Sequence, residues 1–205
     1  MYLLCICSEN RYRNRIPFLS FMPFYCGGGE HVPGGSMSIP TKITRPLSND
    51  TFPRTRLYRL LEQLRDKPAL WISGPPGSGK TALVSGYIDQ AGLTCIWYQM
   101  DAEDGDPATF FYYLAKGAEQ AAGREMHVPP FTAEYYENPL SFTRWYFEQL
   151  CVRLSAPVLL VFDNYQELPP NSVIHTILGT IIGDLRREFN WLSSAGIRCP
   201  MHLFG

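Results

Sequence analysis

The chain has 205 residues, a formal net charge of −1 and a hydrophobic content of 45%. Its length is enough for one domain with a buried core, and its composition is typical of a globular protein rather than a disordered one. The near-neutral charge provides no overall attraction for nucleic acid. No apolar run approaches the roughly 20 residues that a membrane-spanning helix needs, and the N-terminus shows no secretory signal.

The six cysteines are scattered along the chain rather than grouped at regular spacings. Two of them, Cys95 and Cys151, lie in segments that we expect to be a core strand and a core helix. Reduced thiols in a cytoplasmic protein are the simplest interpretation of this distribution.

The N-terminal segment, residues 1–38, shows no sustained helical or alternating period, although it mixes apolar runs, arginines and glycine-rich stretches. We expect little fixed structure there and assign residues 39–205 to the folded domain. One hypothesis is that the natural start is Met37 and that the preceding residues are translated upstream sequence. After an extended lead-in, residues 55–66 are predicted to form a helix with one leucine stripe. The members of that stripe are Leu57, Leu60, Leu61 and Leu64.

A glycine-rich stretch that fits the pattern GxxxxGK[ST] follows this helix, and this pattern is the phosphate-binding P-loop. The glycines allow a tight turn, so that backbone N–H groups converge on an anion. Lys80 is expected to reach the β- and γ-phosphates of a nucleotide, and the Thr81 hydroxyl to bind Mg²⁺. An apolar strand at 69–73 precedes the loop and a helix at 81–90 follows it, in the order that a P-loop requires. The predicted nucleotide-binding residues of the loop are Gly74, Pro75, Pro76, Gly77, Ser78, Gly79, Lys80 and Thr81.

Strands and helices continue to alternate beyond the P-loop. Asp106-Pro107 and Asn138-Pro139 each combine an N-cap residue with a proline at the first helical position. The alternation predicts an α/β fold, a three-layer P-loop NTPase with a mostly parallel sheet. Because such sheets have about five strands, and only a weak fourth strand is indicated at 189–192, we expect the fold to be incomplete at the C-terminus. The expected elements are strands at 94–100 and 158–162, and helices at 107–122, 139–155 and 171–185.

Asp163 ends the buried apolar strand at 158–162, which places it at the same edge of the sheet as the P-loop. There it is expected to hold Mg²⁺, directly or through water, and the alternative is a carboxylate that caps the next turn. Asn164 stands where many P-loop ATPases carry an acidic residue that orients the attacking water, and an amide cannot accept that proton. The sequence predicts Mg²⁺-dependent binding of ATP or ADP, with Lys80 and Asp163 as the catalytic candidates and weak or no hydrolysis.

Two acidic features leave alternatives open. The loop that contains Asp101, Glu103, Asp104 and Asp106 follows the second strand. Its carboxylates either approach the metal edge or form a solvated loop with a helix cap. Glu167 either replaces the missing acidic residue at 164 or is simply solvated.

Three segments together resemble one known family. They are the Pro-Arg lead-in to the leucine-striped helix, the pattern Trp97-x-x-x-Asp101-x-x-Asp104-Gly105-Asp106-Pro107-x-x-Phe110, and the stretch LVFDNYQ at 160–166. Over residues 41–185 the chain resembles the ATP-binding domain of the large LuxR-type, maltose-activator-like transcriptional regulators, which are STAND-class P-loop NTPases.

The resemblance implies a switch between ATP and ADP, with the adenine near residues 53–57 and Arg54 among the nucleotide-binding residues. Asn164 departs from the second aspartate of that family, and Arg198 is a candidate for its sensor arginine. The family binds DNA through regions absent from this chain, and self-association driven by ATP is expected only of a full-length protein. The alternatives are a stand-alone small P-loop ATPase or kinase and a clamp-loader-like AAA⁺ module.

Overall fold

The computed structural model describes residues 2–7, 41–47, 52–65, 67, 69–154 and 158–194. Four parallel strands form one sheet in the order β2-β1-β4-β3. The parallel sheet predicted from the alternation of elements is confirmed. The strands are β1 (Tyr2–Cys7), β2 (Ala69–Ser73), β3 (Cys95–Gln99) and β4 (Leu159–Asp163).

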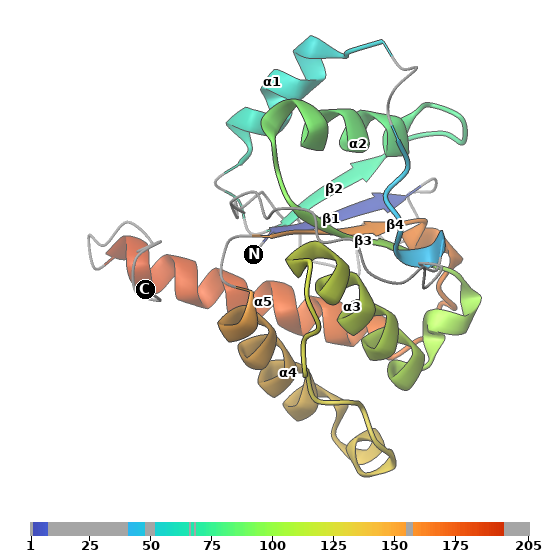
Figure 1. The fold of residues 1–205 in the computed structure, drawn as a ribbon, viewed down its shortest axis with the longest axis vertical. Coiled ribbons are helices and arrows are strands. Elements are labelled where there is room, and N and C mark those ends of the chain that lie inside the picture. The colour runs from blue at the N-terminus through green and yellow to red at the C-terminus, as the bar shows by residue number, and fades with distance from the viewer. Residues whose placement is uncertain are drawn as a thin grey trace.

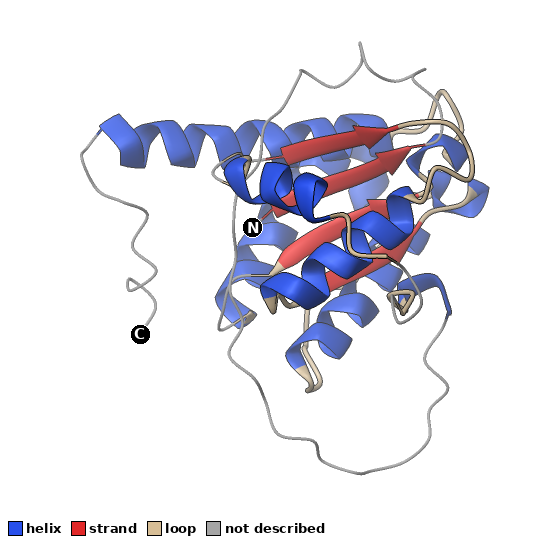
Figure 2. Ribbon diagram, turned by 90° about the horizontal axis from the view of Figure 1, so that it is seen from above, coloured by secondary structure: helices blue, strands red, loops and turns tan. Residues whose placement is uncertain are grey.

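Helices cover both faces of this sheet and complete the expected three layers (Figures 1 and 2). On one face lie α1 (Thr55–Gln63) and α2 (Lys80–Ala91). On the other face lie α3 (Pro107–Ala122), α4 (Pro139–Arg153) and α5 (Ile174–Ser194). The short 3₁₀ turns are η1 (Thr41–Ile43), η2 (Ala102–Gly105), η3 (Ala133–Glu137) and η4 (Tyr165–Glu167).

The ends of the helices agree with the residues predicted to begin and end them. The Asp106 carboxylate accepts the Thr109 N–H at 3.0 Å, and the Asn138 side chain accepts the Ser141 N–H at 3.2 Å. Each of these caps satisfies a backbone donor that the first helical turn leaves unpaired. Gly92 ends α2 in the left-handed region, at a φ of 61°.

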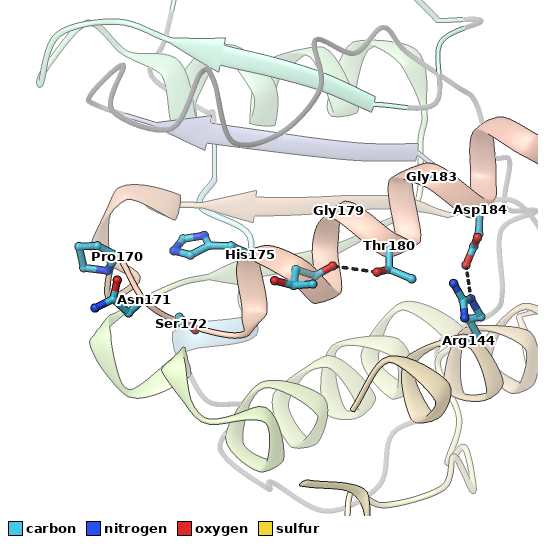
Figure 3. A pocket seen from close by; sticks show the side chains of 10 residues that line it. Arg144, Pro170, Asn171, Ser172, His175, Gly179, Thr180, Gly183 and Asp184 are labelled. Carbon is cyan, nitrogen blue, oxygen red and sulfur yellow. Dashed lines mark hydrogen bonds and ion pairs between the residues drawn. The ribbon is translucent and has the colours of Figure 1, made fainter. Parts of the chain in front are cut away.

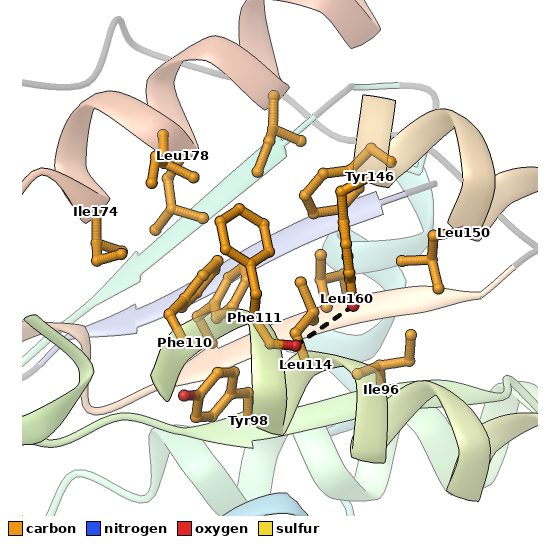
Figure 4. Packing of buried hydrophobic residues seen from close by; sticks show 14 of the residues in the cluster. Ile96, Tyr98, Phe110, Phe111, Leu114, Tyr146, Leu150, Leu160, Ile174 and Leu178 are labelled. Carbon is orange, nitrogen blue, oxygen red and sulfur yellow. Dashed lines mark hydrogen bonds between the residues drawn. The ribbon is translucent and has the colours of Figure 1, made fainter. Parts of the chain in front are cut away.

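The strands alternate between two hydrophobic cores, one on each face of the sheet. Leu159 and Val161 of β4 pack with α1 and α2, whereas Leu160 and Phe162 face α3, α4 and α5. The larger core is rich in aromatic side chains, and Phe111 makes edge-on or tilted ring contacts with Phe110, Phe142 and Tyr146 (Figure 4). Because side chains alternate along a strand, the side chain of residue 163 points to the same face of the sheet as those of Leu159 and Val161.

Two expectations for the ends of the chain are wrong. Residues 2–7 form the strand β1 between β2 and β4, where little fixed structure was expected, and residues 8–40 lie outside the described part. The backbone hydrogen-bonding groups of β1 find partners in both neighbouring strands. Because those partners are distant in the chain, no local pattern in the sequence indicates the pairing. Residues 189–192 belong to α5 instead of a fourth strand, because the helix predicted to stop at 185 continues to Ser194.

Two predicted core positions also face solvent. Leu60 of the leucine stripe is 48% exposed, whereas Tyr58, which is not part of the stripe, is buried in the core that α1 shares with α2 and the sheet. Cys151 is exposed on α4. Cys95 is a free cysteine in β3, and burial raises the pKa of its thiol to about 12, so it stays protonated at neutral pH.

Candidate nucleotide-binding site

The P-loop connects β2 to α2 at the carboxyl edge of the sheet. Gly77 and Gly79 adopt φ values of 73° and 75°, in the left-handed region that residues with a Cβ rarely occupy. Gly79 is also the N-cap of α2, and its carbonyl accepts the Leu83 N–H at 2.9 Å. The loop therefore ends in the first turn of a helix, where N–H groups and the helix dipole favour an anion.

Lys80, the first residue of α2, folds back over the loop. Its Nζ donates to the carbonyl oxygens of Gly74 at 3.1 Å and Pro75 at 3.0 Å, and to Ser78 Oγ at 3.4 Å. An ammonium held by two carbonyls at the mouth of a P-loop is poised to move onto phosphate oxygens, which are stronger acceptors for a cation.

Thr81 and Asp163 meet although they are 82 residues apart in the chain. Thr81 Oγ1 donates to Asp163 Oδ2 at 3.0 Å and lies 3.2 Å from Oδ1. Asp163 has the same parity along β4 as Leu159 and Val161, so its side chain points to the face that α2 covers. The first turn of α2 carries Thr81 onto that face.

This pair of oxygens fits a magnesium ion. Adjacent ligands of an octahedral Mg²⁺ lie about 3.0 Å apart when each bond is about 2.1 Å, close to the Thr81–Asp163 separation. Within the described residues no group of three acidic, histidine or cysteine side chains gathers to hold a metal. Mg²⁺ that arrives with a nucleotide does not need such a group, because phosphates and water supply its other ligands.

Asp163 is a buried residue, with only 3% of its surface exposed. Burial raises its pKa, although the bonds from Thr81 Oγ1 and the Asn164 N–H oppose that rise. A buried carboxylate with a raised pKa is costly to keep ionised, and a divalent cation is the partner that would offset that cost.

Asn164 takes the left-handed conformation at a φ of 58°, the one non-glycine residue of the described chain that does so. Asparagine tolerates this region better than most side chains do. Glu167, the other candidate for an acidic role, is exposed and accepts a bond from Gln166 at 3.1 Å. Residue 164 thus carries an amide next to Asp163, and the contact that Glu167 makes is with Gln166.

Arg54, the N-cap of α1, contacts the P-loop through its guanidinium. Its Nη1 donates to the Ser78 carbonyl at 2.9 Å, and its Nη2 lies 2.6 Å from the position that a Cβ on Gly79 would take. The structure thus brings the predicted residue Arg54 to the loop, in contact with its backbone.

The acidic side chains of the loop after β3 bind the backbone of the loop and one lysine. Asp101 and Asp104 form a reciprocal capping box on η2, with the Asp104 carboxylate accepting the Asp101 N–H at 2.8 Å. Asp104 is fully buried, accepts the Tyr98 hydroxyl and lies 2.9 Å from Lys42 Nζ. Lys42 also pairs with Asp101 at 2.6 Å. Since Asp106 caps α3, the helix-cap alternative describes this loop better than a metal site.

Lys42 is the residue that the sequence interpretation missed. Burial lowers its pKa, but the hydrogen bonds and charges of Asp101 and Asp104 outweigh that effect and raise it. Its Nζ also lies 4.9 Å from the ring centre of Tyr113. A lone lysine in an extended lead-in carries no local signal for such a contact.

A separate pocket of about 670 Å³ lies along α5. No P-loop residue lines it, and the Arg144–Asp184 ion pair, at 2.9 Å, stands at one end (Figure 3). Its wall on α5 consists mainly of small and polar side chains. The residues that line it are Arg144, Pro170, Asn171, Ser172, His175, Thr176, Gly179, Thr180, Gly183 and Asp184.

A parallel sheet between two helical layers, with a glycine-rich loop running into a helix and an aspartate at the end of a nearby strand, defines a P-loop NTPase fold. A family model described as an AAA domain matches residues 54–205, so the chain belongs to that family. No curated protein and no solved structure matches it. None of the helices in the described part is long and apolar enough to cross a membrane.

Proposed function

We propose that the chain is a nucleotide switch module that binds Mg²⁺-ATP and ADP, within a signal-transduction ATPase or transcriptional regulator, with weak or no hydrolysis. The observation that carries this proposal is the Thr81–Asp163 contact at the mouth of a loop with two left-handed glycines. Membership of the AAA domain family supports nucleotide binding. The regulatory role rests on the resemblance to LuxR-type, STAND-class proteins.

In this proposal each residue has a distinct task. The N–H groups of the loop surround the phosphates, and Lys80 exchanges its bonds to Gly74 and Pro75 for bonds to phosphate oxygens. Thr81 and Asp163 hold Mg²⁺, which neutralises phosphate charge. Asn164 supplies no base for the attacking water, so the bound nucleotide persists and its identity can act as a signal.

The decisive experiment is calorimetric titration of the full chain with ATP and ADP, with Mg²⁺ and with excess chelator. We expect both nucleotides to bind, with a clear dependence on Mg²⁺ for ATP. Lys80→Ala should abolish or severely weaken binding. Lys67→Ala is the matched control, because Lys67 is exposed before the start of β2, at the opposite end of that strand from the loop. A Lys80→Ala variant that binds ATP as well as the wild type would refute the site.

The regulatory part of the proposal has its own test. By the resemblance, DNA contacts come from regions outside this chain, so an electrophoretic mobility assay with the chain alone should show no sequence-specific complex. Self-association should appear only in a longer protein that carries the domain, and should follow ATP rather than ADP in sedimentation experiments. A specific complex between the isolated chain and DNA would contradict this assignment.

A further inference from the structure

Arg54 contacts the backbone of the P-loop, and this contact bears on the orientation of one peptide group of the loop. Nη1 donates to the Ser78 carbonyl at 2.9 Å, and Nη2 lies 2.6 Å from the position that a Cβ on Gly79 would take. The described peptide bonds include no cis bond, so the carbonyl of Ser78 and the N–H of Gly79 point to opposite sides of one planar unit. A donor that fixes the direction of the carbonyl therefore also fixes the direction of the N–H.

The position of Arg54 follows from the packing of α1 against the P-loop helix. Leu61 of α1 is buried in the same core as α2, and the Tyr87 hydroxyl on α2 donates to Glu62 at 2.7 Å. The backbone of Arg54 is also constrained, because its carbonyl accepts the N–H groups of Leu57 at 2.8 Å and Tyr58 at 3.0 Å. The guanidinium thus reaches the loop from the start of a helix that packs against α2.

Gly79 is the residue that this contact requires. Its φ of 75° strains any side chain, and a Cβ would meet the Arg54 guanidinium at 2.6 Å. Gly79 thus allows the turn of the loop and also, because it has no side chain, leaves room for the Arg54 guanidinium beside the backbone. The N–H of Gly79 is one of the amides that an anion-binding nest needs to point inward.

We propose that Arg54 is a positioning residue that acts through the Ser78–Gly79 peptide and pre-orients the Gly79 N–H toward the nucleotide phosphates. This inference rests on the proposed function and deepens it. It differs from the expectation that Arg54 binds the nucleotide near the adenine, because a residue that acts through the loop affects any polyphosphate, with or without a base.

The test compares two ligands of the full chain, Mg²⁺-ATP and inorganic Mg²⁺-tripolyphosphate, which has no base. Arg54→Ala should weaken both by the same factor, about five- to tenfold, as expected for the loss of one exposed charge-assisted hydrogen bond. Arg54→Lys, which keeps the charge and one donor, should recover part of that loss. Arg59→Ala, an exposed arginine of α1 outside the stretch expected near the adenine, is the control and should change neither affinity.

A second readout needs no ligand. In nitrogen-15 correlation spectra of the nucleotide-free chain, Arg54→Ala should shift the Gly79 amide resonance, and Arg59→Ala should leave it unchanged. A loss of affinity for ATP alone, or an unmoved Gly79 resonance, would overturn the inference. If instead Lys80→Ala leaves ATP binding intact, the proposed function itself fails, and the two failures are therefore distinguishable.

Discussion

Thr81 lies in the first turn of helix α2 and Asp163 at the end of strand β4, and a hydrogen bond of 3.0 Å joins their side chains at the carboxyl edge of the sheet. One strand, β1, separates the two strands that lead to these residues. The contact therefore depends on the spacing of the whole sheet. It links the phosphate loop to the residue that we expect to hold the metal.

Replacement of Asp163 by asparagine should separate metal binding from stability. Burial raises the pKa of Asp163, so the folded state holds its proton more tightly than the unfolded state does. The stability that this proton contributes is present at low pH and is lost as the pH rises from 3.8, its ordinary value, through the raised pKa. At neutral pH Asp163→Asn should thus unfold no more easily than the wild type, while the dependence of ATP binding on Mg²⁺ disappears.

Urea denaturation at several pH values and calorimetry with and without chelator check both halves of that prediction. The advantage of the asparagine variant should shrink as the pH falls, because the wild-type carboxyl becomes protonated. A variant that is strongly destabilised at neutral pH, or one that keeps its Mg²⁺ dependence, would contradict the assignment of Asp163.

Asn164→Asp should raise ATP turnover, by about tenfold or more, because a carboxylate beside Asp163 can accept a proton that the amide cannot. Aspartate tolerates the left-handed conformation at this position, so the backbone should not change. Phosphate release under single-turnover conditions is the measurement. Asn164→Ala is the control, with the side chain removed, and it should be no faster than the wild type. Equal rates for all three proteins would show that residue 164 does not limit hydrolysis.

Asp104→Ala should cost about 3 kcal/mol of unfolding free energy, because it leaves the ammonium of Lys42 and the hydroxyl of Tyr98 without their buried partner. Asp101→Asn is the comparison, since the Asp101 side chain is 51% exposed and its ion pair with Lys42 is partly solvated. That variant should cost about 1 kcal/mol or less. Urea titrations measure the loss of unfolding free energy in both variants. Similar losses would mean that the buried pair of Asp104 with Lys42 is no more stabilising than the exposed pair of Asp101.

Two helical glycines should respond to alanine in opposite ways. A Cβ on Gly117 of α3 would lie 2.9 Å from Ile96 Cγ2 on β3, so Gly117→Ala should cost about 1–3 kcal/mol. Gly179 of α5 has open space around the same position, and Gly179→Ala should gain about 0.5–1 kcal/mol from helix propensity. Thermal or urea unfolding compares the two. A stabilising change at Gly117 would mean that α3 can move away from the sheet.

Local chemistry made much of this protein predictable. The glycines, Lys80 and Thr81 define the phosphate loop because that function needs those residue types at fixed spacing. Caps such as Asp106 also act within a few residues of their own position. The aspartate at the end of β4 followed from the buried strand before it. These features depend on short stretches of chain, which a sequence displays directly.

Contacts between distant segments decided the rest. The pairing of Lys42 with Asp104 and the approach of Arg54 to Gly79 join segments whose local sequence gives no sign of each other. The place of β1 between β2 and β4 likewise depends on pairing with residues far along the chain. Such contacts depend on how helices pack and how strands align, and the free energy that selects them belongs to the assembled core rather than to any one segment.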